Sequence, residues 1–223
     1  MSEWQAFADR ETLDQALAVR VVSSLQQGIA QRGAAHLVVS GGSTPVNLFS
    51  ILVDSDVDWS RVVVLLADER WVPVDHEDSN ERLVRETLLT GKAHQAQFVS
   101  LLPTPDNEIA NISAVATLLG TLPKFDMVLL GMGEDAHTAS LFPCAAALRE
   151  GLTTTQEALI TRPDNAPHQR VTMSKQRLQD TEQGVIHIVG ENKKAVLELA
   201  MKSDDERRYP ISAVLRPAGV ACR

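Results

Sequence analysis

Aromatic side chains are scarce in this sequence, at 4% of its 223 residues. A surface on which nucleic-acid bases could stack therefore has little to be built from. The formal net charge is -8, whereas proteins that neutralise phosphodiester backbones usually carry a basic excess. We therefore expect no nucleic acid among the partners of this protein.

Cysteines and long hydrophobic runs are also scarce. Cys144 and Cys222 are the only cysteines, which is too few for a disulfide framework, and they lack metal-ligand spacing. The first residues, MSEWQAFADRE, have neither the basic start nor the apolar stretch of a signal peptide, and no later run approaches membrane-spanning length. These absences predict a cytoplasmic protein that works in a reducing compartment and has no membrane partner.

The chain has the size and the apolar content, 44%, of one globular domain covering residues 1–223. Segments with a helical apolar period alternate with short apolar runs. This alternation favours a single-domain α/β fold with a mostly parallel open sheet and helices on both faces, Rossmann-like and doubly wound. We predict helices at 13–33, 46–52, 79–89, 108–122 and 191–201, and strands at 36–40, 62–67, 126–130, 158–161, 170–173, 185–189 and, lastly, 212–214 with 219–221.

The stretch 126–143 joins a predicted buried strand to a polar turn. After the apolar residues of the strand, Gly131 and Gly133 favour a tight turn that delivers Asp135 and His137 together. Ligands of open α/β sheets bind in the crevice beyond the carboxyl ends of the strands, and an imidazole there suits general-base catalysis. A lone histidine is more often structural, but Asp135 and the turn favour the catalytic interpretation. No second His or Cys stands at ligand spacing, so we expect no metal.

A second polar turn consists of Gly41, Gly42, Ser43 and Thr44, between an apolar strand and a helix. The backbone N–H groups of such a turn favour an anion such as phosphate. An ordinary tight turn, with Ser43 or Thr44 as the helix cap and Pro45 at the first helical position, fits equally well. The turn has neither the Walker nor the GxGxxG pattern, and Pro45 replaces the second glycine of a nucleophile elbow. A bound nucleotide and a serine hydrolase are therefore disfavoured.

Four charged residues lie at the ends of other predicted strands. Asp68 and Arg70 follow a buried strand, and Arg70 offers planar donors to a carboxylate, carbonyl or phosphate. A charged run such as residues 68–70 is usually a solvated loop when nothing else is known of it. Its position directly after a buried strand favours a functional role. Arg170 begins one late strand and Lys193 follows another, so both are expected to face the same crevice, where they would neutralise a phosphate dianion.

Four blocks of this sequence, taken together, resemble the signature blocks of the 6-phosphogluconolactonase family, which also contains glucosamine-6-phosphate isomerases. The blocks occur in the order of that family and extend over most of the chain. They read GGSTP, DERWVP followed by DSN at 78–80, GMGEDAHTASLFP, and RVTMS.

The resemblance implies hydrolysis of 6-phospho-D-glucono-1,5-lactone to 6-phosphogluconate, the second step of the oxidative pentose phosphate pathway, without a metal or organic cofactor. It implies that His137 is the base, that Asp135 fixes its tautomer, and that Arg70 or an N–H group stabilises the oxyanion. The residues implied to bind the substrate are Gly41, Gly42, Ser43, Thr44, Asp68, Asn80, Arg170 and Lys193.

One residue departs from the pattern of the family, which commonly has Gly-x-Asp-Gly-His. This chain has Ala136 where the second glycine is expected. If this position has a positive φ, alanine costs about 1 kcal/mol there. We therefore expect a slight shift of the loop and no loss of it.

Two other functions compete with lactone hydrolysis. Glucosamine-6-phosphate deaminases resemble this chain, but their histidine is followed by a run that contains a glutamate, whereas residues 138–143 hold no carboxylate. A catalytically silent sugar-phosphate sensor is the second alternative, and the retention of His137 with Asp135 favours an enzyme. The expected partner is a phosphorylated sugar lactone, and the protein is expected to be a monomer or a small homo-oligomer.

Overall fold

The computed structural model describes residues 4–214 and 219–222 and is built around a seven-stranded sheet. Its strands follow the order β1-β10-β9-β6-β2-β3-β5, and each neighbouring pair is parallel. The prediction of a mostly parallel α/β sheet is therefore confirmed. The strands are β1 (Trp4–Ala6), β2 (Ala35–Val39), β3 (Val62–Leu66), β5 (Gln97–Val99), β6 (Phe125–Leu130), β9 (Thr181–Ile188) and β10 (Gly219–Cys222).

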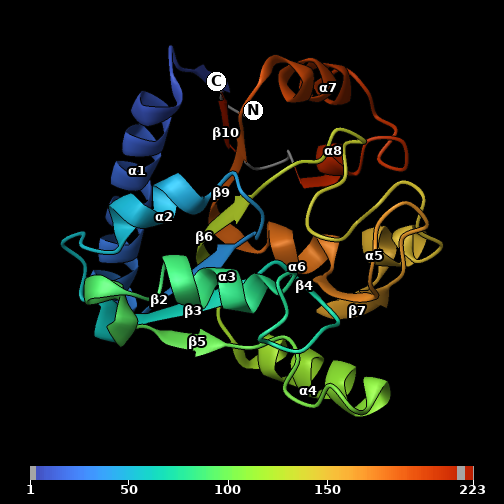
Figure 1. The fold of residues 1–223 in the computed structure, drawn as a ribbon, viewed down its shortest axis with the longest axis horizontal. Helices are drawn as coiled ribbons and strands as arrows, with labels where there is room; N and C mark the ends of the chain where they lie inside the picture. Colours follow the sequence, from blue (N-terminus) through green and yellow to red (C-terminus); the bar gives the residue numbers. More distant parts are fainter. Residues whose placement is uncertain (1–3, 215–218, 223) are drawn as a thin grey trace.

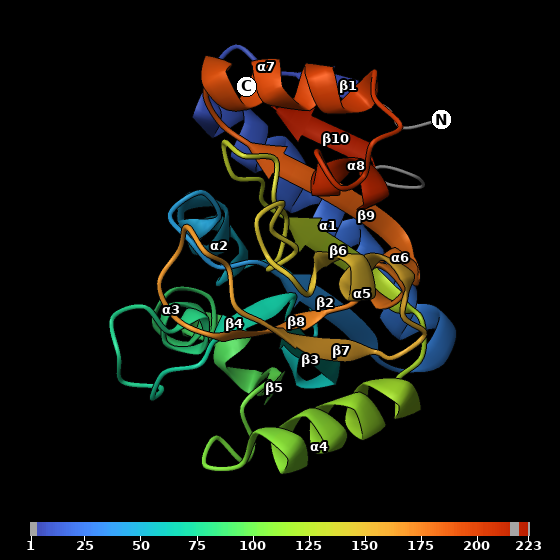
Figure 2. The ribbon, with the colours of Figure 1, turned by 90° about the vertical axis from the view of Figure 1, so that its right-hand side faces the viewer.

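Helices cover both faces of the sheet, as predicted. Helix α1 (Arg10–Arg32) packs against β2 and β6 on one side, whereas α5 (Leu148–Thr153) and α6 (Lys175–Gln179) lie on the other (Figure 1, Figure 2). Within residues 4–214 and 219–222, no helix combines the length and the apolar character needed to cross a membrane. The other α-helices are α2 (Val46–Leu52), α3 (Asn80–Thr87), α4 (Glu108–Thr121), α7 (Glu191–Met201) and α8 (Pro210–Val214).

The centre of the core lies where β2, β3 and β6 run side by side. All residues of β2 and β6 are buried, as is nearly all of β3, which explains why these strands read as continuous apolar runs. Each fully buried Leu or Val side chain here stabilises the fold by about 1.5–3 kcal/mol relative to exposure. The rigid strands end at the same edge, and the polar turns that follow them are held in fixed positions.

A second, three-stranded antiparallel sheet stands beyond that edge. It consists of β4 (Asp68–Arg70), β8 (Arg170–Met173) and β7 (Ala158–Thr161), in the order β4-β8-β7. Strand β4 leaves β3 after one residue, Ala67, whose carbonyl accepts the N–H of Met173. The small sheet therefore continues directly from the large one and forms a wall next to its carboxyl edge.

The structure differs from the prediction at residues 68–70 and 212–214. The charged residues 68–70 are not part of a predicted strand, but they form β4, because their backbone pairs with β8. Residues 212–214 were expected to form part of a strand, but they lie in α8, which begins at Pro210, a residue suited to a first helical turn. The other half of that prediction, 219–221, is confirmed by β10.

Candidate active site

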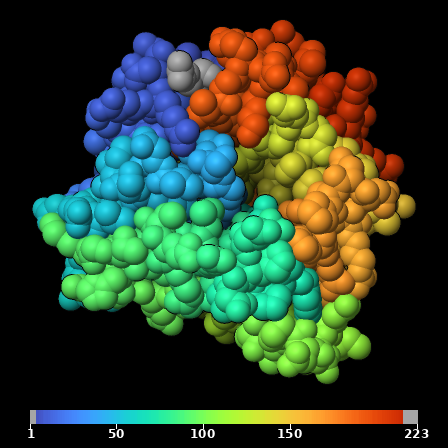
Figure 3. Space-filling view, viewed as in Figure 1, coloured from blue at the N-terminus to red at the C-terminus, as the bar shows by residue number. Residues whose placement is uncertain are grey.

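A cavity of about 270 Å³ opens at the carboxyl ends of β2, β3 and β6. The surface is hollowed near its centre, where segments from the first, middle and later parts of the chain meet (Figure 3). Every residue predicted for the site lines this cavity except Asp135, which lies behind His137. The lining residues are Ser40, Gly41, Gly42, Ser43, Thr44, Asp68, Arg70, Asn80, Gly131, Met132, Gly133, His137, Ala139, Arg170 and Lys193.

The turn 41–44 presents donors that have no partner in the described part of the chain. Gly42 has a φ of 86°, a conformation that favours glycine. None of the four N–H groups donates a hydrogen bond to another residue in the part of the chain that the structure describes. The alternative in which Ser43 or Thr44 caps α2 is wrong, because Pro45 is the N-cap residue and no side chain caps the helix. These N–H groups and hydroxyls are therefore free to bind an anion.

Three cations converge on the same cavity. Arg70 of β4 and Arg170 of β8 are register partners in the antiparallel pair, and both line the cavity together with Lys193 of α7. Like charges directly opposite each other on a sheet destabilise it. Burial lowers the pKa of Arg170, although Asp68 opposes this effect, and the Arg170 Nε has no hydrogen-bond partner among the described residues. An anion in the cavity would reduce the repulsion between the Arg70 and Arg170 guanidinium groups and would accept the hydrogen bonds that they do not make within the described residues.

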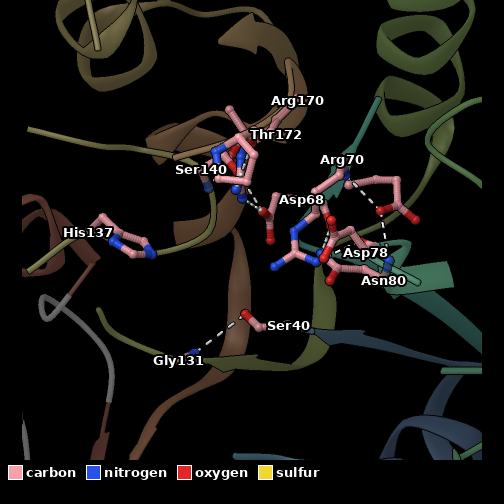
Figure 4. Close-up of polar contacts among 12 residues, drawn as sticks. Ser40, Asp68, Arg70, Asp78, Asn80, Gly131, His137, Ser140, Arg170 and Thr172 are labelled. Atoms are coloured by element: carbon pink, nitrogen blue, oxygen red, sulfur yellow. Dashed lines mark hydrogen bonds and ion pairs between the residues drawn. The ribbon is translucent and has the colours of Figure 1, made fainter. Parts of the chain in front are cut away.

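Asp68 is held between the cations by its neighbours. Its Oδ2 accepts a hydrogen bond from the Ser140 Oγ at 2.5 Å and lies 3.9 Å from the Arg170 Nη1 (Figure 4). The Ser140 N–H in turn donates to the Thr172 Oγ1 at 3.2 Å. The Asn80 Nδ2 donates to the Asp68 carbonyl at 2.9 Å. These contacts fix the carboxylate, the Arg170 guanidinium and the Asn80 amide relative to one another.

Glu69, whose role no sequence pattern indicates, organises the chain around Arg70 and Asn80. Its side chain does not line the cavity, is almost fully buried and accepts the N–H groups of Arg70, Asn80 and Glu81 at 2.6 to 2.8 Å. Burial raises the pKa of Glu69, and these hydrogen bonds oppose the rise. One buried carboxylate therefore ties the end of β4 to the start of α3.

His137 and Asp135 form a hydrogen-bonded pair. The Nδ1 of His137 lies 2.5 Å from the Asp135 Oδ1, which also accepts the His137 backbone N–H at 3.2 Å. Burial alone would raise the pKa of Asp135, but the bonds from His137 and one from Asn165 lower it to about 2. A charged Asp135 assigns the ring proton to Nδ1, so Nε2, which has no partner among the described residues, carries the lone pair.

The turn that carries this pair has the geometry expected of it. Ala136 has a φ of 66°, so the expected positive φ is confirmed. Its N–H donates to the Gly133 carbonyl and its carbonyl accepts the Ile211 N–H, both at 3.0 Å. A side chain at Gly133 would overlap the His137 imidazole. The imidazole therefore occupies space that only a glycine at position 133 leaves open.

One group of histidines and a carboxylate outside the cavity has the composition of a metal site. Ligand atoms of His76, Asp78 and His168 lie within 4.8 Å of one another. The His76 Nδ1, however, already accepts the Asp78 N–H at 3.0 Å, and the His168 Nε2 lies 2.9 Å from the Asp78 Oδ2. The three residues therefore already contact one another through these ligand atoms and the Asp78 backbone. The expectation that the protein uses no metal stays a prediction.

Sequence reasoning missed Ser140, Thr172 and Phe142, although a signal for Thr172 was present. Residues two apart on a strand share a face, and Arg170 with Thr172, like Asp68 with Arg70, obeys that spacing. The charged run 68–70 has no apolar alternation that would identify it as the strand that pairs with Thr172. The position of Phe142 against His137 depends on the path of a loop, which no periodicity encodes.

The comparisons with known proteins agree with this geometry. The 6-phosphogluconolactonase of Pseudomonas putida is 41% identical over 211 residues, which cover 93% of this chain and 87% of that protein. The 6-phosphogluconolactonase of Neisseria meningitidis serogroup A is 38% identical over 226 residues, covering 100% and 97%. The crystal structure of a 6-phosphogluconolactonase from Shewanella baltica OS155 superposes with a TM-score of 0.95 at 44% identity, covering 100% of this chain and 97% of that one.

The family described as glucosamine-6-phosphate isomerases/6-phosphogluconolactonase matches residues 8–222 of this chain. That match includes the small sheet, every strand of the large sheet except β1, and every residue that lines the cavity. It confirms the resemblance drawn from the four sequence blocks. The chain therefore belongs to the glucosamine-6-phosphate isomerase/6-phosphogluconolactonase family.

Proposed function

We propose that the protein hydrolyses 6-phospho-D-glucono-1,5-lactone to 6-phosphogluconate and that residues 1–223 form one lactonase domain. The observation that carries the proposal is the composition of the cavity. Arg70, Arg170 and Lys193 line it together with the turn 41–44, and His137 lines it as well; the N–H groups of the turn and the Nε2 of His137 have no partner among the described residues. A phosphate and a hydrolysable bond are the groups that these two features recognise.

The phosphate binds to the turn 41–44, Arg170 and Lys193. Charge-assisted hydrogen bonds to a phosphate are stronger than neutral ones. Burial disfavours the charged form of Arg170, and a bound anion would offset this effect. Because the phosphate is remote from the bond that breaks, its binding energy orients the lactone carbonyl toward His137. Asp68 and Asn80, which line the cavity between these groups, contact the sugar ring.

The chemical step is the attack of water on the lactone carbonyl carbon. The His137 Nε2 takes a proton from the water as the new C–O bond forms, while Asp135 holds the imidazole through Nδ1. Arg70 or a backbone N–H stabilises the tetrahedral oxyanion. The ring C–O bond then breaks, and the departing hydroxyl oxygen takes the proton back from His137. The reaction needs no metal and no organic cofactor.

The location, the oligomeric state and the partners of the enzyme belong to the same proposal. We place the enzyme in the cytoplasm as a monomer or a small homo-oligomer whose partner is the phosphorylated lactone. The formal net charge of -8 supports the absence of nucleic acid from its partners.

A lactonase assay that is corrected for spontaneous hydrolysis tests the proposal. Fresh 6-phosphogluconolactone is supplied with and without the protein, and acid release is followed with time. Arg170→Met is expected to raise KM by about 100-fold through the loss of a buried charged partner. The matched control is Arg162→Met, because Arg162 is exposed and pairs with Glu108 outside the cavity. Identical KM values for the two variants would contradict the placement of the phosphate.

The same preparation distinguishes the two competing functions. Ammonia release from glucosamine 6-phosphate without lactone hydrolysis would replace the proposal with a deaminase. Among the described residues, Asp68 is the one carboxylate that lines the cavity, and it already accepts a hydrogen bond from Ser140, which disfavours a deaminase that needs a further acid. Tight binding of 6-phosphogluconate without turnover of either substrate would identify a sensor.

A further inference from the structure

Arg10, the first residue of α1, contacts the backbone of the turn 41–44. Its Nη2 donates to the Ser43 carbonyl at 3.3 Å and to the Thr44 carbonyl at 3.0 Å. Its Nε lies 3.4 Å from the Asp14 Oδ2, one helical turn further along α1. Arg10 itself does not line the cavity. The guanidinium therefore contacts the backbone of the turn and leaves the anion site to other residues.

Because the peptide bond is planar, the contact between Arg10 and the Ser43 carbonyl also determines the direction of the Thr44 N–H. In a trans peptide the carbonyl and the next N–H point in opposite directions, and the described residues contain no cis peptide bond. The Ser43 carbonyl accepts a hydrogen bond from Arg10, so the Thr44 N–H points away from Arg10, and Thr44 itself lines the cavity. This N–H is one of the four unpaired donors of the turn.

The anchor of Arg10 is a buried network. The fully buried Asp14 Oδ2 accepts a hydrogen bond from the Asn47 Nδ2 at 2.7 Å, and its Oδ1 lies 3.0 Å from the His187 Nε2. Burial lowers the pKa of His187, although Asp14 opposes this effect. Among the described residues, Arg10 is the arginine or lysine that forms an ion pair with Asp14, and it offsets a negative charge that would otherwise repel a phosphate bound at the turn.

We propose that Arg10 is a positioning residue for the phosphate-binding turn and sets the preference for phosphorylated over unphosphorylated lactones. The inference rests on the proposed lactonase function and adds a residue outside the cavity to it. Without Arg10, the turn loses the contacts that aim the Thr44 N–H, and the uncompensated carboxylate of Asp14 opposes the phosphate. The base, His137, belongs to another loop and keeps its geometry.

Kinetics of Arg10→Ala with two substrates test this role. The KM for 6-phosphogluconolactone is expected to rise about 5- to 20-fold, as for loss of a charge-assisted hydrogen bond, with kcat within about two-fold. The kcat/KM for unphosphorylated glucono-1,5-lactone stays at the wild-type value, because that substrate does not use the turn. Arg20→Ala is the matched control, since Arg20 lies on the same helix and contacts Gln183 instead. That control is expected to leave both substrates unaffected.

Arg10→Lys separates geometry from charge. A single ammonium group cannot hold Asp14 and both carbonyls at once, so its KM for the phosphorylated lactone also rises. A wild-type KM in Arg10→Ala, a wild-type KM in Arg10→Lys, or an equal loss of kcat/KM for both lactones in a folded variant would overturn the positioning role. These outcomes leave the lactonase activity of the wild-type protein intact.

A binding measurement keeps the inference testable if the wild-type protein shows no lactonase activity. That result would refute the proposed function, and calorimetry with inorganic phosphate would then report on Arg10 alone. Weaker phosphate binding by Arg10→Ala than by Arg20→Ala supports the role of Arg10. Equal binding by both variants overturns it.

Discussion

The ring of Phe142 stacks on the imidazole of His137, with centroids 3.9 Å apart and planes inclined by 20°. The guanidinium carbon of Arg170 lies 5.1 Å from the centroid of the same phenyl ring. Phe142 is buried, so it has no freedom to leave these contacts. One aromatic side chain therefore connects the proposed base to the proposed phosphate site.

Phe142→Leu is expected to lower kcat by about 10-fold, because an imidazole that is no longer stacked leaves the geometry needed for proton transfer. Steady-state kinetics on 6-phosphogluconolactone measures the change. Phe49→Leu is the control, since Phe49 is fully buried and does not line the cavity. Both variants should lose stability by about 1–2 kcal/mol, but only Phe142→Leu should lose kcat. An equal kcat in the two variants would show that the stack has no part in catalysis.

His137→Asn removes the proposed base while keeping a polar side chain of similar size. The catalysed rate should fall by about 100- to 10,000-fold, the usual contribution of general-base catalysis. The affinity for 6-phosphogluconate, measured by calorimetry, should stay within about two-fold because the phosphate contacts are intact. His94→Asn serves as the control, as His94 is exposed and contacts the Gly91 carbonyl. Turnover at the wild-type rate would remove His137 from the mechanism.

Asp135→Asn should lower kcat by about 100- to 10,000-fold as well, because a carboxamide no longer assigns the proton to the Nδ1 of His137. The pKa of Asp135 is about 2, below its ordinary value of 3.8. The charged carboxylate therefore stabilises the folded state above pH 3.8, and this contribution disappears as the pH falls toward 2.

Urea unfolding of the wild-type protein and Asp135→Asn across this range measures the effect. The difference in the free energy of unfolding should be constant above the ordinary pKa of 3.8 and should shrink as the solution is acidified below it. A difference that does not change with pH would mean that the His137 contact does not lower the pKa of Asp135.

The strands of the large sheet could be predicted because their signal is local. Residues 62–66 and 125–130 are buried on both faces, so continuous apolar runs identify them without knowledge of their partners. Strand β4 carries no such signal. Asp68–Arg70 is three charged residues whose strand character comes from pairing with Arg170–Met173, about a hundred residues later in the chain. A pairing of this kind is set by the tertiary fold.

The residues of the site also divide into those that could be predicted from the sequence and those that could not. Residues in turns that directly follow strands, such as Ser43 and His137, were placed from the sequence because the edge of a parallel sheet gathers such turns. Arg10 lies before the predicted helix 13–33, and Glu69 belongs to a charged run. Their roles come from contacts to backbone groups of other segments, which residue patterns do not report.

Ala136 gives a prediction about the loop that carries His137. Its φ of 66° costs alanine about 1 kcal/mol, which glycine avoids. Glycine, however, gains about 0.4–1 kcal/mol of entropy in the unfolded chain and loses the contacts of a buried methyl group. Ala136→Gly should therefore change the free energy of unfolding by less than about 0.5 kcal/mol. Ala136→Val should lower it by about 2 kcal/mol or more, because a β-branched side chain tolerates this conformation poorly.

The activity of Ala136→Gly decides whether alanine shifts the loop. Backbone hydrogen bonds to Gly133 and Ile211 hold residue 136 from both sides, and neither bond involves the methyl group. The position of His137 should then be the same with either residue, and kcat should agree within about two-fold, since a displacement of about 1 Å costs far more. A kcat of Ala136→Gly several-fold above that of the wild type would mean that the alanine holds His137 away from its best position.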